Sequence, residues 1–171
     1  MPTTGSESTK IESLGQKISR IAKKHGFTLA AAESLTGGRI SCHLAGAPDS
    51  SSWYAGGVTS YETRIKYEVL GVPEGHPVIA EEAVSQMAVG VAKLMTADVA
   101  IAVSGVGGPD SQEGNPPGTT WIAAAVRGTL HTRLHHFDGG PEDVLGQTEE
   151  HALTLLYDSM VEFINLQEKD V

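Results

Sequence analysis

The sequence contains one cysteine, Cys42, among 171 residues. One cysteine excludes an intrachain disulfide and a metal site built from several thiolates. No apolar run is long enough to span a bilayer. Residues 1–9 lack the basic start and apolar stretch of a secretory signal. We therefore expect a cytoplasmic protein that is not bound to a membrane, with a disordered tail over residues 1–9.

Basic residues are also scarce: 12 Lys and Arg stand against 21 Asp and Glu, for a net charge of -9. This balance argues against nucleic acid as the main partner, because a phosphate backbone requires a basic face. A small anionic ligand needs only local donors and is not excluded. With 40% hydrophobic and 19% charged residues, the composition is globular. The length corresponds to about one domain.

The hydrophobic pattern alternates between strand-like and helix-like segments. Expected strands are 27–32, 53–61, 99–103 and a hairpin over 119–126 and 129–137; expected helices are 11–25, 39–45, 62–70, 81–96 and 141–166. Alternating strands and helices indicate an α/β layered sheet. The late hairpin makes the sheet mixed rather than purely parallel. We expect a single-domain layered α/β/α sandwich over residues 10–168.

Three polar or glycine-rich segments follow expected strands: 33–38, 56–66 and 104–118. Ligands of open α/β sheets bind outside the carboxyl ends of the strands, so these segments are expected to be neighbours. The glycines of 105–108 expose backbone N–H groups that could form an anion-binding nest. A flexible connection is the alternative interpretation.

Ser34 lies in an expected strand-to-helix turn. Its hydroxyl could be a nucleophile, with neighbouring N–H groups holding an oxyanion. The commoner use of such residues is to cap the next helix, and from the residues alone capping by Ser34 or Thr36 is favoured. The turn matches neither a phosphate-binding P-loop nor the dinucleotide fingerprint, nor the nucleophile elbow of α/β-hydrolases.

Lys66 and Tyr61 follow the second expected strand. A serine nucleophile needs a base, and a lysine can serve if burial lowers its pKa. The alternative, favoured from the residues alone, is a solvated lysine and a half-buried tyrosine. His131 and His135 alternate with Arg133 on a strand, which favours a solvated face over a metal site. No metal is expected.

Several stretches together resemble the CinA C-terminal domain family, which includes the PncC-type nicotinamide-nucleotide amidases. The resemblance runs from about Ile11 to about Leu166. The matching stretches are Ala32-Glu33-Ser34-Leu35-Thr36-Gly37-Gly38, Gly56-Gly57-Val58-Thr59-Ser60-Tyr61 with Lys66, Leu70-Gly71-Val72-Pro73, Val103-Ser104-Gly105-Val106-Gly107-Gly108-Pro109 and Pro117-Gly118-Thr119.

The resemblance implies hydrolysis of the carboxamide of nicotinamide mononucleotide, giving nicotinic acid mononucleotide and ammonia. It implies Ser34 as nucleophile and Lys66 as base, assisted by Tyr61, with no cofactor and in a homo-oligomer. Substrate-binding residues are then expected in the glycine-rich turns: Glu33, Thr36, Gly37, Gly38, Ser104, Gly105 and Gly107.

The sequence departs from the family pattern at the start of the final helix. The family typically has two arginines there, and this chain has Pro141 and Leu145. Arginine binds oxyanions bidentately, so its loss leaves two other hypotheses open: a catalytically weak or silent member that binds a nucleotide or partner protein, and a serine-lysine amidase for a less anionic amide. Compensating arginines could be Arg39, Arg64, Arg127 or Arg133.

Overall fold

The computed structural model describes residues 4–171, with side chains from Leu14 onward. Its centre is one five-stranded sheet in the order β2-β1-β3-β4-β5. The strands are β1 (Leu29–Glu33), β2 (Tyr54–Thr59), β3 (Val99–Gly105), β4 (Thr119–Val126) and β5 (Thr129–His136). β1 pairs in parallel with β2 and β3, whereas β4 and β5 add antiparallel strands. The expected mixed sheet is confirmed.

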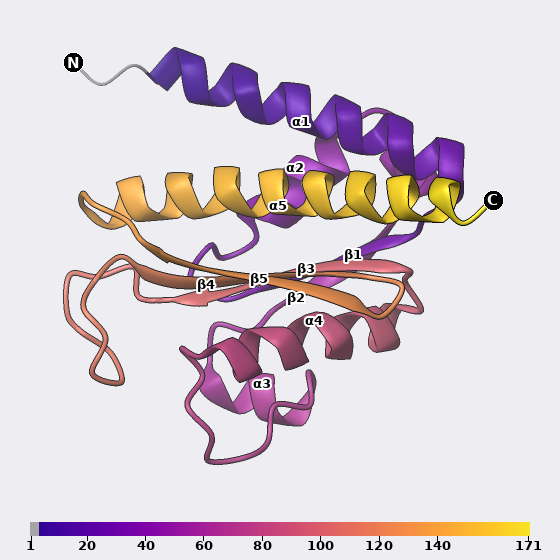
Figure 1. Ribbon diagram of the computed structural model, residues 1–171. Coiled ribbons are helices and arrows are strands. Elements are labelled where there is room, and N and C mark those ends of the chain that lie inside the picture. Colours follow the sequence, from indigo (N-terminus) through magenta and orange to yellow (C-terminus); the bar gives the residue numbers. More distant parts are fainter. Residues whose placement is uncertain (1–3) are drawn as a thin grey trace.

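Helices cover both faces of the sheet (Figure 1). One face carries α1, α2 and α5, and the other carries α3 and α4. The helices are α1 (Thr4–His25), α2 (Arg39–Gly46), α3 (Thr63–Glu68), α4 (Glu81–Met95) and α5 (Pro141–Lys169), with a short 3-10 turn over Ser50–Ser52. The α/β/α sandwich is therefore confirmed as the architecture.

The element boundaries differ from the expected ones mainly at the N-terminus. A tail is expected over residues 1–9. Residues 1–3 lie outside the described part of the chain, and α1 begins at Thr4, inside the expected tail. At its other end α1 stops before Gly26, which adopts φ 68°, as the expected C-terminal cap. In the described part of the chain, no helix is long and apolar enough to cross a membrane.

The two faces of the central strands carry side chains of different size. Ile101 and Val103 of β3 face the core beneath α1 and α5. Ala100 and Ala102 of the same strand face α4. Small side chains let a helix approach the sheet closely, so α4 packs tightly. The backbone of α4 also lies close to Leu70, because a Cβ added at Gly90 would lie 2.0 Å from the Leu70 carbonyl oxygen.

This close approach makes Gly90 intolerant of any side chain. We expect Gly90→Ala to lower the free energy of unfolding by about 1–3 kcal/mol, the usual cost of overpacking. Gly46→Ala is the matched control, because a Cβ at this helical glycine meets no atom within 4 Å. Urea unfolding of both variants measures the difference. Equal stability of the two variants would contradict the packing described.

Candidate active site

The carboxyl ends of β1, β2 and β3 meet at one edge of the sheet and open into a cavity of about 440 Å³. The three segments expected to be neighbours all contribute to it. The lining residues are Ser34, Leu35, Tyr61, Thr63, Lys66, Val78, Ile79, 104–112, Pro141 and Leu145.

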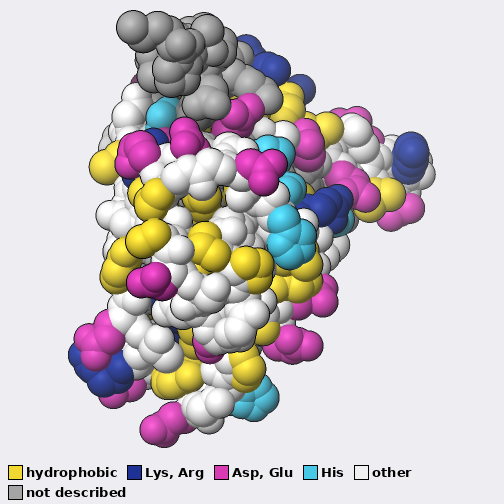
Figure 2. Space-filling view, turned by 90° about the vertical axis from the view of Figure 1, so that its left-hand side faces the viewer, with side chains coloured by type: hydrophobic (Ala, Val, Ile, Leu, Met, Phe, Trp, Pro, Cys, Tyr) yellow, Lys and Arg dark blue, Asp and Glu magenta, His cyan; other side chains and the backbone are white. Residues whose placement is uncertain are grey.

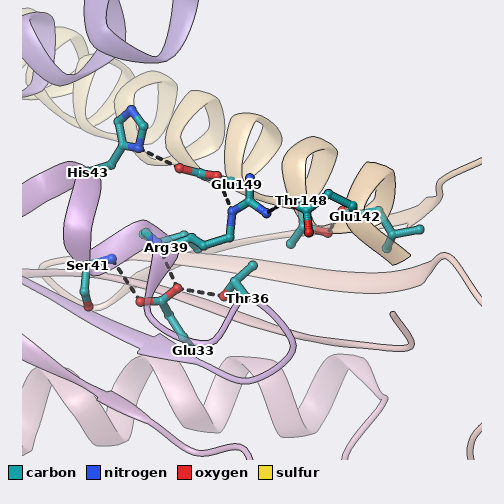
Figure 3. A network of polar contacts seen from close by, with 10 residues as sticks. Glu33, Thr36, Arg39, Ser41, His43, Glu142, Thr148 and Glu149 are labelled. Carbon is teal, nitrogen blue, oxygen red and sulfur yellow. Dashed lines mark hydrogen bonds and ion pairs between the residues drawn. The ribbon is translucent and has the colours of Figure 1, made fainter. Parts of the chain in front are cut away.

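Ser34 lies in the turn that follows β1, and the preceding residue holds that turn in place. The Glu33 side chain is fully buried. Its carboxylate accepts hydrogen bonds from the Thr36 hydroxyl (2.7 Å) and from the N–H groups of Ile40 (2.9 Å) and Ser41 (2.9 Å) (Figure 3). A carboxylate at these N–H groups caps helix α2 and complements its dipole.

Capping of α2 by Ser34 or Thr36 is therefore a wrong interpretation. The N-cap residue is Gly38, and it makes no side-chain cap hydrogen bond. The cap comes from Glu33 on the strand before the turn, which local spacing rules for Ser and Thr do not anticipate. Among the described residues the Ser34 hydroxyl has no hydrogen-bond partner, and its side chain lines the cavity.

Of the expected substrate-binding residues, three line the cavity and four do not. Ser104, Gly105 and Gly107 are in its wall. Glu33 and Thr36 are buried in the cap network behind the turn. Gly37 and Gly38 form the turn itself, with φ 58° and 109°, and are not in the wall either.

Lys66 is buried, so the interpretation of this residue as a solvated lysine is wrong. Its side chain is 2% exposed, and its Nζ donates a hydrogen bond to the Ser60 carbonyl at 2.5 Å. Burial lowers the pKa of Lys66 from 10.5 to about 8, and the negative charge of Glu113 partly opposes this shift. About a tenth of the amine is then neutral at pH 7.

The Ser60 main chain connects Lys66 to Ser34. The Ser60 N–H and hydroxyl both donate to the Glu33 carbonyl, at 2.7 and 2.9 Å, so β1 and β2 are joined directly beside Ser34. Tyr61 follows and is 72% exposed, not half-buried as expected. In the described part of the chain no hydrogen bond joins Ser34, Tyr61 and Lys66 to one another. Catalytic hydrogen bonds often tighten only when substrate binds.

The comparisons with known proteins agree with this architecture. The model of the CinA C-terminal domain matches residues 11–160. The chain belongs to the CinA C-terminal domain family. It is 32% identical over 160 residues to the nicotinamide-nucleotide amidohydrolase PncC of Escherichia coli K12, covering 90% of this chain and 97% of that one. Protein YdeJ of the same organism is 33% identical, with coverages of 85% and 88%.

Solved structures of the family share the fold. The CinA superfamily protein of Klebsiella pneumoniae superposes with a TM-score of 0.84 at 32% identity, covering 89% of this chain and 98% of that one. The chain therefore resembles its relatives in the whole sandwich and not only in the sequence motifs.

Pro141 and Leu145, the positions at which the resemblance leads us to expect arginines, both lie in the cavity wall. None of the four candidate replacement arginines is in that wall. Arg39 is paired with Glu142 and Glu149, both at 2.8 Å (Figure 3). Lys66 is thus the one cationic side chain lining the cavity in the described part of the chain, and Asp110 is the one carboxylate.

Basic side chains are also scarce near the centre of the surface at this end of the molecule. Figure 2 looks onto the end of the molecule where α5 begins and the loop after β3 protrudes; hydrophobic side chains gather near its centre, and Lys and Arg lie toward its rim. Arg64 pairs with Glu62 and Glu68 at 3.2 and 2.7 Å.

The histidines of β5 lie apart from the cavity. His135 stacks on Phe137, with ring centroids 4.9 Å apart, and contacts His151 of α5. Of the residues expected on a solvated face, Arg133 is exposed, whereas His131 and His135 are half-buried. Within the described residues, no three His, Cys, Asp or Glu side chains are grouped so that they could hold a metal ion.

Sequence reasoning missed part of the cavity wall. Val78 and Ile79 precede α4 in a stretch that resembles a plain loop in the sequence, and no local signal marks them. Pro141 and Leu145 were singled out only through the family resemblance. Their place in the wall depends on how α5 crosses the sheet, which short-range patterns do not encode.

The Glu33 cap provides a direct test of how the turn is held. Glu33→Gln removes the charge and places an amide N–H₂ group against backbone N–H donors. We expect it to lower the free energy of unfolding by about 1.5–3 kcal/mol, the range for hydrogen bonds to charged groups. Glu74→Gln, at an exposed site that makes no hydrogen bond or ion pair with another described residue, is the control, and urea unfolding measures both. Equal stability of the two variants would show that the carboxylate does not cap α2.

Burial of Lys66 predicts a pH-dependent cost to the fold. Between pH 8 and 10.5 the unfolded chain holds the Lys66 proton and the folded chain releases it, so the free energy of unfolding rises with pH in this window. Lys66→Met abolishes this dependence. The stability of Lys66→Met relative to the wild type should therefore be greatest below pH 8 and fall toward pH 10.5. Lys93→Met, at an exposed site on α4, should show no such trend in chemical unfolding over the same range. A constant difference for Lys66→Met would contradict the burial.

Proposed function

We propose that this protein is an amidohydrolase that releases ammonia from the carboxamide of nicotinamide mononucleotide or a close relative. The observation that carries the proposal is the meeting of Ser34 with a buried lysine of lowered pKa in one cavity. The identity to a nicotinamide-nucleotide amidohydrolase over nearly the full length supports the same reaction class.

In the proposed reaction the neutral amine of Lys66 takes the proton of the Ser34 hydroxyl. Serine is a weak nucleophile without such a base. The Ser34 Oγ then attacks the amide carbon, and the carbonyl becomes a tetrahedral oxyanion. Tyr61, at the mouth of the cavity, can relay the proton between Ser34 and Lys66.

Main-chain donors in the cavity suit the developing oxyanion. Gly107 and Gly108 line it, and within the described residues neither donates its N–H to another backbone group. The C–N bond then breaks, the Lys66 ammonium returns its proton to the leaving nitrogen, and ammonia departs. Water resolves the acyl ester on Ser34 with Lys66 again as base, which yields the free carboxylate.

A second candidate is an amidase of the same mechanism for an amide without a phosphate. The observation that favours it is the cavity wall, where Pro141 and Leu145 are apolar and Asp110 is anionic. A phosphate held there would have Lys66 as its one cationic side chain. The two candidates differ only in what the cavity recognises away from the reacting carbon.

Ammonia release from nicotinamide mononucleotide tests the reaction, with Lys66→Met as the paired variant. We expect the wild type to turn over and the variant to lose at least about a hundredfold in kcat/KM, the usual scale for a general base. The kcat/KM of the wild type should rise with pH through about 8, as the lysine becomes neutral. Turnover by Lys66→Met at the wild-type rate would sink the proposed base.

Nicotinamide riboside, the same amide without phosphate, separates the two substrate candidates. A nucleotide site should prefer the mononucleotide and should be inhibited by inorganic phosphate. Preference for the riboside, with no effect of phosphate, would favour the second candidate. A folded protein that hydrolyses neither amide would overturn both.

A further inference from the structure

The loop between β3 and β4 lines the cavity and is hydrogen-bonded to the segment that precedes α4. Glu113 lies at the tip of this loop. One of its carboxylate oxygens accepts from the N–H groups of Val78 (3.0 Å) and Ile79 (2.7 Å), and the other accepts from Val78 as well (3.0 Å). These charge-assisted hydrogen bonds fasten two segments that are 34 and 35 residues apart in the sequence.

The same segment is held on its other side by the cavity wall. The Ser104 hydroxyl donates to the Val78 carbonyl at 2.6 Å in a buried position. Val78 and Ile79 also pack with Val106 in a small apolar cluster. All four of these residues line the cavity, so Glu113 holds its wall from outside without lining it.

The backbone at Glu113 indicates that its side chain has a role beyond the turn. Glu113 adopts φ 50° and Gly114 adopts φ 75°. They are the central residues of a turn closed by Gln112 and Asn115, whose N–H groups each donate to the other's carbonyl, at 3.0 and 2.9 Å. Glycine or asparagine suits such a position better than glutamate. The carboxylate clamp offsets this conformational cost.

Glu113 is also connected electrostatically to the base. Its charge favours the protonated form of Lys66 and so raises the pKa that burial lowers. The other titratable groups that line the cavity with Lys66 are Tyr61 and Asp110. The carboxylate that fastens the wall is therefore the same group that adjusts the charge state of the proposed base.

We propose that Glu113 is a positioning residue of this active site: its carboxylate clamps the 106–118 loop onto Val78 and Ile79, which fixes the wall of the cavity that contains Lys66. Glu113 acts through this wall and through Lys66, and does not touch the reacting atoms. The catalytic consequence rests on the proposed amidase function, whereas the clamp itself does not.

Hydrogen exchange tests the clamp without any substrate. In Glu113→Gln the side chain keeps its length but loses its charge, and its amide N–H₂, itself a donor, replaces one of the two oxygens that accept from the Val78 N–H. In Glu113→Asn the backbone turn is favoured, but the side chain is too short to reach. We expect the Val78 and Ile79 amides to exchange at least about tenfold faster in both variants, the factor expected for a lost charge-assisted hydrogen bond. Glu74→Gln, an exposed charge change in the neighbouring loop, is the control and should leave both rates unchanged.

Titration of Lys66 and steady-state kinetics test the consequence. NMR titration of the Lys66 side chain should give a midpoint below the wild-type value of about 8 in Glu113→Gln, and the pH profile of kcat should shift in the same direction. A loosened wall should raise the KM for nicotinamide mononucleotide several-fold. Unchanged amide exchange together with an unchanged Lys66 midpoint would overturn the proposal. If the wild type proves inactive on the amide, the proposed function fails, and exchange and titration still decide the clamp.

Discussion

The buried carboxylate of Glu33 is the interaction on which the rest of the site depends. Its side chain caps α2 and so fixes the turn that presents Ser34. Its main-chain carbonyl binds Ser60, whose own carbonyl holds the amine of Lys66. One residue at the end of a central strand therefore orients both proposed reactants. A buried charge is tolerated only when its hydrogen bonds are satisfied, and three donors provide this at Glu33.

Glu33 and Lys66, both buried at this site, have opposite consequences for the fold. Glu33 is fully hydrogen-bonded and stabilises the turn. Among the described residues Lys66 donates one side-chain hydrogen bond, to the Ser60 carbonyl, and its burial lowers the pKa at a cost to stability near neutral pH. Such destabilised groups are concentrated at functional sites. The charge of Glu113 moderates this cost from outside the cavity, which connects the loop after β3 to the chemistry proposed for Lys66.

Most of the architecture follows from local sequence patterns. The apolar runs and helical spacings predicted the five described strands and five α-helices, because the helices bury an apolar stripe against the sheet and the central strands are buried on both faces, whereas the 3-10 turn over Ser50–Ser52 lies in an expected loop. The site was predicted less completely. Ser34, Tyr61 and Lys66 do line one cavity, but residues alone favoured a capping serine and a solvated lysine. Glu33 as a cap, and Val78 and Ile79 as a wall, depend on contacts between distant segments that no short-range pattern reveals.

Ser34→Ala tests whether Ser34 is the nucleophile, because it removes only a hydroxyl group that has no hydrogen-bond partner among the described residues. The measurement is the rate of ammonia release from nicotinamide mononucleotide by this variant and by the wild type, with urea unfolding as the check on folding. We expect a folded variant whose rate is at least about a thousandfold lower, as for loss of a nucleophile. A folded Ser34→Ala protein that releases ammonia at the wild-type rate would contradict this role of Ser34.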